Sequence, residues 1–323
     1  MTPALYPIKF EPILKEKIWG GKKLKRILHK KSDRPNVGES WEISDVDGDV
    51  SVVANGMLKG QSLKQLLQDH GKEILGEHNF KTFGTKFPLL IKFIDAKADL
   101  SIQLHPNDEL AAKRHNSFGK TEMWYVMQAD QDAKLIVGFN QEMNQALYLK
   151  HLKNNTLIDI LNVDPVKTGD SYFIDVGRVH AIGSGVLLAE IQQTSDITYR
   201  VYDWDRVDDQ GNARELHNDL AIDAFDFDMP DDFRLSYASE ANKSNDMVSC
   251  AYFKTSFVHV TQTLPKQNDK DSFFIYICVE GEAQIVSNQG TETIKSGETL
   301  FLPAAIKQYQ LVSKNAKLLE VYV

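Results

Sequence analysis

The segment GDSYFIDVGRVH at residues 169–180 decides the fold, because it recurs without gaps as GETLFLPAAIKQ at residues 297–308. Each copy begins at a glycine turn, continues as a short apolar strand and reaches a second turn. The strand that follows begins with His180 in the first copy and with Gln308 in the second. A strand–turn–strand unit that occurs twice in one chain predicts two similar β domains.

The repeated unit resembles the second sequence motif of the cupin β-barrels, which is a glycine, five residues, a proline, one residue, a glycine, two residues and a histidine. The first copy has Asp175 in place of the proline but keeps Gly177 and His180. The second copy keeps Pro303 but has neither the later glycine nor the histidine. The resemblance implies a mainly β fold of two cupin (jelly-roll) barrels with a few flanking helices, in which the second barrel lacks a metal site.

The rest of the chain agrees with this organisation. After residue 245 the sequence contains only strand-like segments, which are SFVHVTQTL, SFFIYICVEG, EAQIVS, TETIKSG, TLFLPA and KLLEVYV. The polar stretch 229–245 is interpreted as a linker. We therefore predict an N-terminal catalytic domain at 1–228 and a C-terminal domain at 246–323. In the first domain we expect a strand at 87–94 and four helices, one from Ser62 with Gln65 completing a capping box, and the others at 107–114, 140–150 and 156–162.

The composition narrows the classes of function. A formal net charge of −8 leaves no basic excess to neutralise nucleic-acid phosphates or an anionic membrane surface. No apolar run approaches the ~18 residues that a membrane span needs. Cys250 and Cys278 have no paired-ligand spacing and are interpreted as small buried hydrophobic residues, which favours a reducing compartment. We expect a cytoplasmic protein with neither a nucleic-acid nor a membrane partner.

Two strand-like segments carry candidate metal ligands. In LSIQLHP (100–106) the alternation of a strand places Ser101, Gln103 and His105 on one face, although the same pattern also fits the solvated face of an edge strand. In GKTEMWY (119–125) it groups Lys120, Glu122 and Trp124, and such residues are usually exposed.

The repeat places Glu122 inside the barrel, because it aligns Glu122 with Phe273 of the second domain. A carboxylate at an inward position needs a cation. With His180 and the two ligands of 100–106 it would form a set of two imidazoles, one carboxylate and one carboxamide. Borderline metals such as zinc accept imidazole nitrogen and carboxylate oxygen, whereas glutamine is a weak neutral ligand.

A third segment, EIQQTSDITYRVYDW (190–204), is unusually polar for a strand-rich region. Strand spacing places Asp196, Thr198 and Arg200 on one face. An arginine there suits a phosphate or an oxyanion, and the alternative is a structural Asp–Arg pair.

Together these segments resemble the type I phosphomannose isomerases along most of the chain. The segments that carry the resemblance are KIWGGKKL (17–24), GESWEIS (38–44), PLLIKFIDA (88–96), LSIQLHPND (100–108), GKTEMWYV (119–126), GRVHAIGSG (177–185) and EIQQTSDITYRVYDWDR (190–206). The interval between Glu122 and His180 is too short for the extra helical domain of the longer members, so the chain is most similar to the short bacterial form.

The resemblance implies interconversion of mannose 6-phosphate and fructose 6-phosphate, with one zinc ion held by Gln103, His105, Glu122 and His180. It also implies catalytic roles for Lys120, Asp196 and Arg200, and substrate binding by Ser101, Lys92 and Glu190, with Ser101 and Lys92 on the phosphate side.

The expected mechanism passes through an enediolate, and either Lys120 or Asp196 serves as the base. The alternatives are another metal-dependent cupin enzyme, such as an iron(II) oxygenase, and a non-enzymatic module that binds a sugar phosphate. The sequence gives no reason to expect more than a monomer or a weak oligomer.

Overall fold

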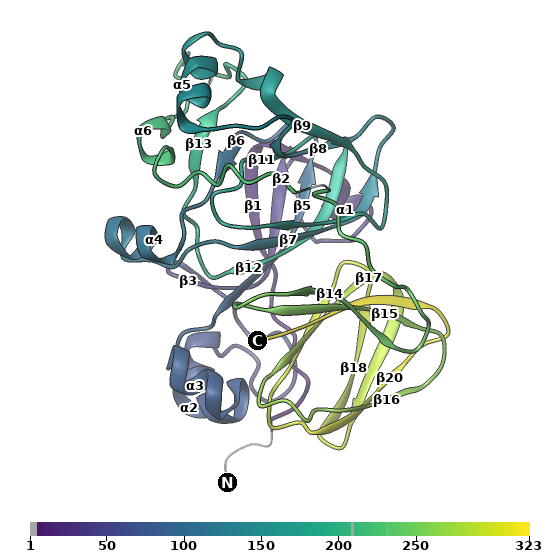
Figure 1. Ribbon diagram of the computed structural model, residues 1–323. Coiled ribbons are helices and arrows are strands. Elements are labelled where there is room, and N and C mark those ends of the chain that lie inside the picture. The colour runs from purple at the N-terminus through teal and green to yellow at the C-terminus, as the bar shows by residue number, and fades with distance from the viewer. Residues whose placement is uncertain (1–4, 208–209, 231) are drawn as a thin grey trace.

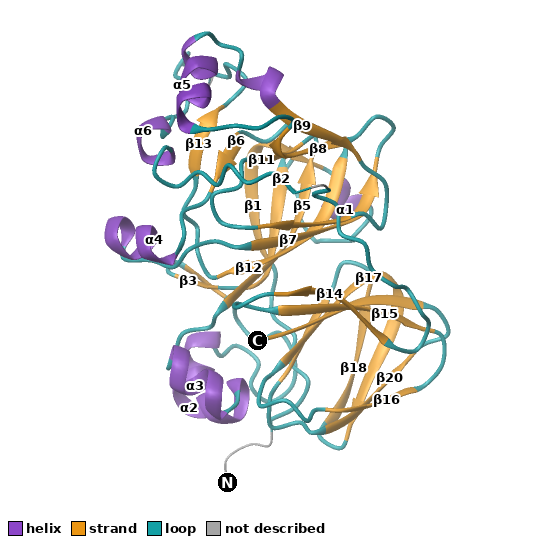
Figure 2. Cartoon of the chain, in the orientation of Figure 1, coloured by secondary structure: helices purple, strands orange, loops and turns teal. Residues whose placement is uncertain are grey.

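The computed structural model describes residues 5–207, 210–230 and 232–323, and it contains two β domains that pack against each other (Figure 1). Strands dominate both domains, and the helices lie at their edges (Figure 2). Within the described residues, no helix combines the length and the apolar character needed to cross a membrane.

The described residues of the N-terminal part, up to residue 230, form thirteen strands and six α-helices. The strands are β1 (Ile13–Gly21), β2 (Val37–Ile43), β3 (Asp45–Val46), β4 (Asp49–Val50), β5 (Leu89–Ala96), β6 (Ile102–Leu104), β7 (Glu122–Ala129), β8 (Lys134–Phe139), β9 (Leu161–Pro165), β10 (Ser171–Ile174), β11 (His180–Ile182), β12 (Val186–Gln193) and β13 (Tyr199–Tyr202). The helices are α1 (Lys23–Arg26), α2 (Leu63–Leu75), α3 (Glu77–Phe83), α4 (Asp108–His115), α5 (Gln145–Lys153), the 3-10 helix η1 (Leu157–Ile160) and α6 (Asn218–Ala221).

The N-terminal barrel is made of two antiparallel sheets. One sheet has the strand order β1-β2-β5-β12-β7-β10 and the other has the order β13-β6-β11-β8-β9. One buried cluster joins the two sheets, and it includes Trp124 and Leu188 of the first and Val137 and Ile182 of the second. This apolar cluster stabilises the packing of the two sheets. Polar side chains of β6, β7 and β11 lie outside it and belong to the site described below.

The C-terminal barrel is one curled antiparallel sheet with the order β14-β15-β21-β17-β20-β16, to which β18 and β19 add by pairing with β17. Its strands are β14 (Ser244–Ser249), β15 (Lys254–Val260), β16 (Leu264–Gln267), β17 (Phe274–Ser287), β18 (Gly290–Lys295), β19 (Thr299–Leu302), β20 (Gln308–Val312) and β21 (Ala316–Tyr322). The two strands expected at SFFIYICVEG and EAQIVS are one strand, β17, whose first half pairs with β19 and β21 and whose second half pairs with β18 and β20. The predicted fold, two cupin barrels with flanking helices, is confirmed.

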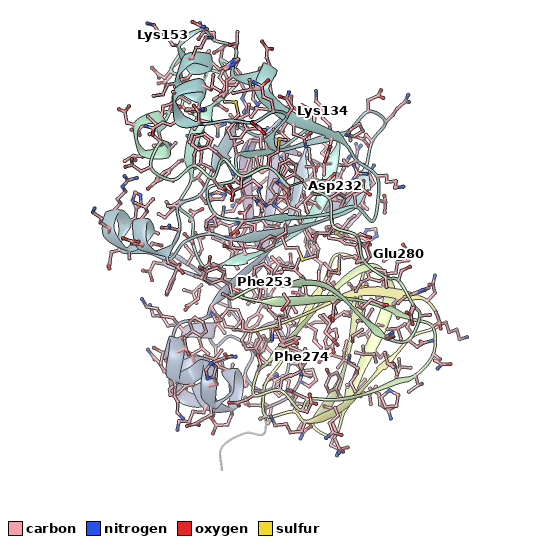
Figure 3. All side chains as sticks on the ribbon, in the orientation of Figure 1. Lys134, Lys153, Asp232, Phe253, Phe274 and Glu280 are labelled. Atoms are coloured by element: carbon pink, nitrogen blue, oxygen red, sulfur yellow. The ribbon has the colours of Figure 1, made fainter. Side chains whose placement is uncertain are left out.

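The two barrels share a hydrophobic core. One cluster contains Tyr125 and Ile191 of the first barrel, Phe257 and Leu319 of the second, and the apolar face of α2. Phe253, which Figure 3 labels where the barrels meet, is 1% exposed in this cluster. The domain boundary expected at 229–245 stays a prediction, because residues of the N-terminal part also pack against the C-terminal barrel in this cluster.

Helix α2 begins as expected, because the Ser62 side chain accepts a hydrogen bond from the backbone N–H of Gln65 (3.1 Å). The capping box is incomplete, since the Gln65 carboxamide donates to Asp69 instead of returning to residue 62. Helices α4 and α5 confirm the second and third predicted helices, with Asn107 and Asn144 as their N-caps. The helix predicted at 156–162 is wrong: only the short η1 forms, and from Leu161 onward the backbone pairs with β8 as strand β9.

The strand register corrects the sequence alignment of Glu122. Glu122 pairs with Ile174 between β7 and β10, whereas the repeat's counterpart of Ile174, Leu302, pairs with Phe274. The position equivalent to Glu122 is therefore Phe274 and not Phe273. A slip of one residue moves a side chain to the other face of a strand. Phe273 lies in the shared core, while Phe274 lies in the interior of the C-terminal barrel (Figure 3), so the inward position expected for Glu122 holds.

Candidate active site

Three side chains that can bind a metal meet inside the N-terminal barrel. His105 follows β6, Glu122 opens β7 and His180 opens β11, and each is 1% exposed. Their ligand atoms all lie within 4.8 Å of one another. In the described part of the chain this is the one group of at least three His, Cys, Asp or Glu side chains with such spacing. No such group lies in the C-terminal barrel, all of which is described.

The carboxylate of Glu122 lies between the two imidazoles. Its Oε1 is 3.4 Å from Nε2 of His105, and its Oε2 is 3.8 Å from Nε2 of His180. The ammonium group of Lys120 borders the same atoms, 2.9 Å from Oε1 of Glu122 and 3.4 Å from Nε2 of His105. We call His105, Glu122 and His180 the triad.

Backbone carbonyls fix the orientation of both imidazoles. Nδ1 of His105 lies 2.8 Å from the carbonyl oxygen of Ile197, and Nδ1 of His180 lies 2.8 Å from that of Arg178. A carbonyl oxygen can only accept, so each Nδ1 carries a proton. In the neutral rings each Nε2 therefore offers its lone pair towards Glu122, which is the arrangement of a metal-binding histidine.

The charges of the triad also suit a metal. Burial lowers the pKa of His105 to about 4, with the nearby charge of Lys120 adding to the effect, and burial also lowers the pKa of His180. Burial alone would raise the pKa of Glu122, but the nearby charge of Lys120 holds it well below its usual value. The triad therefore consists of two neutral imidazoles and one ionised carboxylate.

Several polar atoms of the triad are left unsatisfied. Among the described residues, neither carboxylate oxygen of Glu122 nor Nε2 of His180 has a partner with hydrogen-bond geometry, although the ion-pair distances are short. Buried polar atoms without partners are costly and call for an explanation. A divalent cation that uses these lone pairs would supply one, so the residues present fit a bound metal.

Gln103 is placed to be a fourth ligand. It lies in the middle of β6, opposite His180 of β11 and Arg200 of β13 in the strand register. The side chain is half-buried, and its Oε1 accepts a hydrogen bond from Oγ of Ser101 (3.3 Å). Because a carboxamide oxygen is a weak ligand, its part in metal binding stays a prediction.

A polar pocket of about 340 Å³ adjoins the triad. Of the site residues predicted from the sequence, those that line it are Lys92, Ser101, Gln103, Lys120, His180, Glu190, Asp196 and Arg200. The other two, His105 and Glu122, lie behind this lining in contact with Lys120. All the predicted site residues are thus gathered at one pocket, while their individual roles remain predictions.

One wall of the pocket consists of paired charges. Lys92 lies 3.1 Å from Oε1 of Glu190, whose Oε2 accepts a hydrogen bond from the indole of Trp124 (2.8 Å). On β1 and β2, Lys17 lies 3.3 Å from Glu39. Although burial alone would lower the pKa of Lys92, Glu190 and Glu39 hold it above its usual value. Burial alone would raise the pKa of Glu39, but Lys92 and Lys17 outweigh it and lower that pKa.

The opposite wall carries Arg200 on β13. Its Nε donates to Oγ of Ser101 (3.3 Å), and its Nη1 donates to the backbone carbonyl of Glu215 (2.9 Å). Asp196 and Thr198 also line the pocket, as the strand spacing predicted. Within the described residues no ion pair joins Asp196 to Arg200, so the alternative of a structural Asp–Arg pair is wrong.

Some pocket residues were not assigned to the site from the sequence. Lys17, Trp19 and Glu39 lie in the segments KIWGGKKL and GESWEIS, so their place in the family pattern was a usable signal. Arg214 lies outside every quoted segment. It reaches the pocket because the loop after β13 folds back, with a β-bridge between Val207 and Ala213, and no local pattern predicts that.

The chain is similar to known proteins along most of its length. The sequence matches the model of the phosphomannose isomerase type I catalytic domain at residues 8–135 and that of the mannose-6-phosphate isomerase cupin domain at residues 243–323. It is 34% identical to mannose-6-phosphate isomerase ManA of Bacillus subtilis, over 94% of this chain and 95% of the relative. It is 33% identical to the mannose-6-phosphate isomerase of Streptococcus mutans, over 94% of each.

Solved structures lead to the same family. The crystal structure of the mannose 6-phosphate isomerase from Bacillus subtilis matches with a TM-score of 0.89 and 31% identity, over 99% of this chain and 100% of that one. A mannose 6-phosphate isomerase bound with zinc and yttrium shares the fold, with a TM-score of 0.77 and 16% identity, over 98% of this chain and 99% of that one. The chain therefore belongs to the type I phosphomannose isomerase family, and it is an enzyme of the mannose-6-phosphate isomerase class.

Proposed function

We propose that this enzyme interconverts mannose 6-phosphate and fructose 6-phosphate with one zinc ion per chain, held by the triad and Gln103. The observation that carries the proposal is the buried triad with unsatisfied lone pairs beside a polar pocket. Zinc suits two imidazole nitrogens and a carboxylate oxygen, and a member of the same fold is described as bound with zinc. When bound, zinc would supply positive charge that stabilises an enediolate.

The protein's own contribution begins with the transfer of a proton between C2 and C1 of the sugar. Lys120 and Asp196 both line the pocket, and they differ in their surroundings. Lys120 is 4% exposed and lies against the triad, whereas Asp196 is exposed at the pocket. Either side chain can act as the base if the sugar lies within hydrogen-bond reach of it, and Arg200 on β13 would stabilise developing negative charge.

The pocket wall that contains the Lys92–Glu190 ion pair suits the uncharged hydroxyl groups of the substrate. Lys92 and Glu190 are both buried and already compensate each other's charge. Such a pair presents a donor and an acceptor to sugar hydroxyls without requiring a charged ligand. Ser101, whose hydroxyl lies between Gln103 and Arg200, would contact the substrate from the other side.

A coupled assay tests the reaction. Mannose 6-phosphate is offered to the zinc-loaded enzyme, and fructose 6-phosphate is detected through glucose-6-phosphate isomerase and glucose-6-phosphate dehydrogenase. We expect turnover, and in D2O we expect solvent deuterium in the product at the carbon that receives the proton. A folded, zinc-loaded protein without turnover would overturn the proposed function, and turnover without any deuterium would argue against a base that exchanges with solvent.

Two histidines and one carboxylate are also the ligands of iron(II) oxygenases, which makes such an enzyme the second candidate. It predicts that turnover depends on oxygen and on iron. Membership of the isomerase family favours the first candidate, and isomerisation under nitrogen with zinc alone would exclude the second.

A further inference from the structure

The two walls of the pocket differ in net charge. On the wall formed by β1, β2, β5 and β12, the cations Lys17 and Lys92 are matched by the carboxylates Glu39 and Glu190. The charge of the pocket's remaining carboxylate, Asp196, helps to raise the pKa of Lys92 on this wall. This wall therefore has no uncompensated positive charge with which to bind an anion.

Among the described residues, the wall formed by β6, β13 and the loop that follows β13 has more cations than buried carboxylates. Arg200 and Arg214 both line the pocket there, and Arg206 binds the same carboxylate, Asp203, as Arg214. The buried carboxylate described there, that of Asp203, is 4% exposed and pairs with Arg206 and Arg214, and its charge also acts on Arg200. The carboxylate of Glu215 is 83% exposed and lies 4.0 Å from a histidine ring, so it leaves most of the excess uncompensated.

Asp203 fixes the orientation of Arg214. Nε of Arg214 donates to Oδ2 of Asp203 (2.7 Å), and Nη2 donates to Oδ1 of the same carboxylate. Arg206 binds Asp203 as well, but its Nη1 donates to the backbone carbonyl of Asp99 (2.7 Å), so its guanidinium is committed to the protein. The fork on Asp203 leaves Nη1 of Arg214 on the opposite side of the guanidinium, and this side chain lines the pocket.

Burial lowers the pKa of Arg200, and the charge of Arg214 lowers it further. The two guanidinium groups therefore repel each other. Two like charges that share a pocket are a signature of a site built for a ligand of opposite charge. A phosphate group with two negative charges matches this excess and accepts hydrogen bonds from guanidinium groups.

We propose that Arg214, oriented by Asp203 and adjacent to Arg200, binds the phosphate group of the substrate, so that the sugar lies between this cationic wall and the triad. This inference rests on the proposed function, because it takes a sugar phosphate as the substrate. Lys92, whose charge Glu190 and Glu39 already compensate, then contacts the sugar and not the phosphate.

The test compares Arg214→Gln and Arg214→Lys with a control, Arg114→Gln. Arg114 is a suitable control because it, like Arg214, binds one aspartate, Asp223, and because it lies outside the pocket. Each zinc-loaded variant is assayed for KM and kcat with mannose 6-phosphate and for inhibition by inorganic phosphate. Zinc content and the thermal midpoint check that each variant is folded.

For Arg214→Gln we expect KM and the inhibition constant of phosphate to rise by about tenfold or more, as for the loss of one charge-assisted hydrogen bond. We expect kcat to change less than KM, Arg214→Lys to recover part of the loss, and Arg114→Gln to match the unaltered enzyme. Values of KM and of the inhibition constant within twofold of the unaltered enzyme would overturn the inference while leaving the proposed function intact.

Calorimetric titration with inorganic phosphate separates the two claims. If the unaltered enzyme binds phosphate but does not turn over mannose 6-phosphate, and Arg214→Gln no longer binds it, the anion site stands and the proposed function falls. If phosphate binds both proteins equally, the inference falls whatever the enzyme catalyses.

Discussion

The two barrels place a buried glutamate at equivalent positions and surround it with similar partners. In the first barrel Glu190 pairs across the strands with Trp124 and accepts a hydrogen bond from its indole. In the second barrel Glu320 pairs with Tyr276 and accepts a hydrogen bond from its hydroxyl (2.5 Å). Each carboxylate also faces a lysine, Lys92 at 3.1 Å in the first barrel and Lys266 at 2.6 Å in the second.

The barrels differ at the position two residues before that aromatic side chain. The first barrel has Glu122 there, with unsatisfied oxygens, and the second has Phe274, which is buried among apolar side chains. At the motif's last position the first barrel has His180 and the second has Gln308. Buried polar groups that find their partners within the protein are structural. Buried lone pairs without a partner, as in the first barrel, are suited to bind a ligand.

The largest expected effect comes from making the first barrel like the second. His180→Gln puts the residue of the second copy into the first, and we expect zinc to be lost and turnover to fall by about three orders of magnitude. Metal analysis and the coupled assay on the same sample measure both effects. The matched control is Gln308→His, which should bind no second zinc because Phe274 stands where a carboxylate is needed. A fully active His180→Gln enzyme with one zinc would break the comparison.

The next effect concerns Lys120, whose counterpart by the same register is Ser272, two residues before Phe274. If Lys120 is the base, Lys120→Met lowers kcat by about 10²–10⁴-fold while zinc remains bound. If Asp196 is the base, Asp196→Asn produces that loss instead. Near-normal turnover of Lys120→Met with zinc retained would remove Lys120 from the chemistry.

A third change tests whether the polar centre of the second barrel is structural. Glu320→Leu leaves Lys266 and the Tyr276 hydroxyl without their carboxylate, and removing one partner of a buried ion pair costs about 3–5 kcal/mol. We expect the free energy of unfolding in urea to fall by about 3 kcal/mol, with kcat per folded molecule unchanged. A selective loss of kcat at normal stability would contradict a purely structural role.

The smallest expected effect concerns a contact between the barrels. The hydroxyl of Tyr252, from the second barrel, donates to Asp108 (2.9 Å), which also accepts from the backbone N–H of Gly119 beside Lys120. Tyr252→Phe removes one hydrogen bond, and we expect a loss of about 1 kcal/mol in stability and at most a few-fold decrease in kcat. Thermal unfolding and the coupled assay measure both, and a decrease of 100-fold would show that the second barrel takes a larger part in catalysis.

The sequence predicted the two barrels from the repeated turn motif, and it predicted the site residues through the resemblance to the type I phosphomannose isomerases. Strand alternation and a duplicated turn motif are local, so they favoured inward positions for Glu122 and His180, whereas for Gln103 the solvated face of an edge strand remained an alternative. The alignment of Glu122 with Phe273 was off by one, because hydrogen bonding between strands, and not sequence spacing, sets the register.

Features that depend on tertiary contacts escaped the sequence. The helix expected at 156–162 does not form in full, because the backbone from Leu161 onward pairs with β8. Arg214 was missed because its place in the pocket depends on Asp203, eleven residues away and on the other side of a loop. The ion pair between Lys92 and Glu190 was not predicted either, because it joins two strands that are far apart in the chain.

Removal and return of the metal tests the central claim most directly. The enzyme is stripped with a chelator, its zinc content and isomerisation of mannose 6-phosphate are measured, and zinc is then restored in steps. The account predicts that turnover disappears on stripping, rises in proportion to bound zinc and reaches its maximum at one zinc per chain. Full turnover by folded, metal-free enzyme, or a need for two zinc ions per chain, would contradict it.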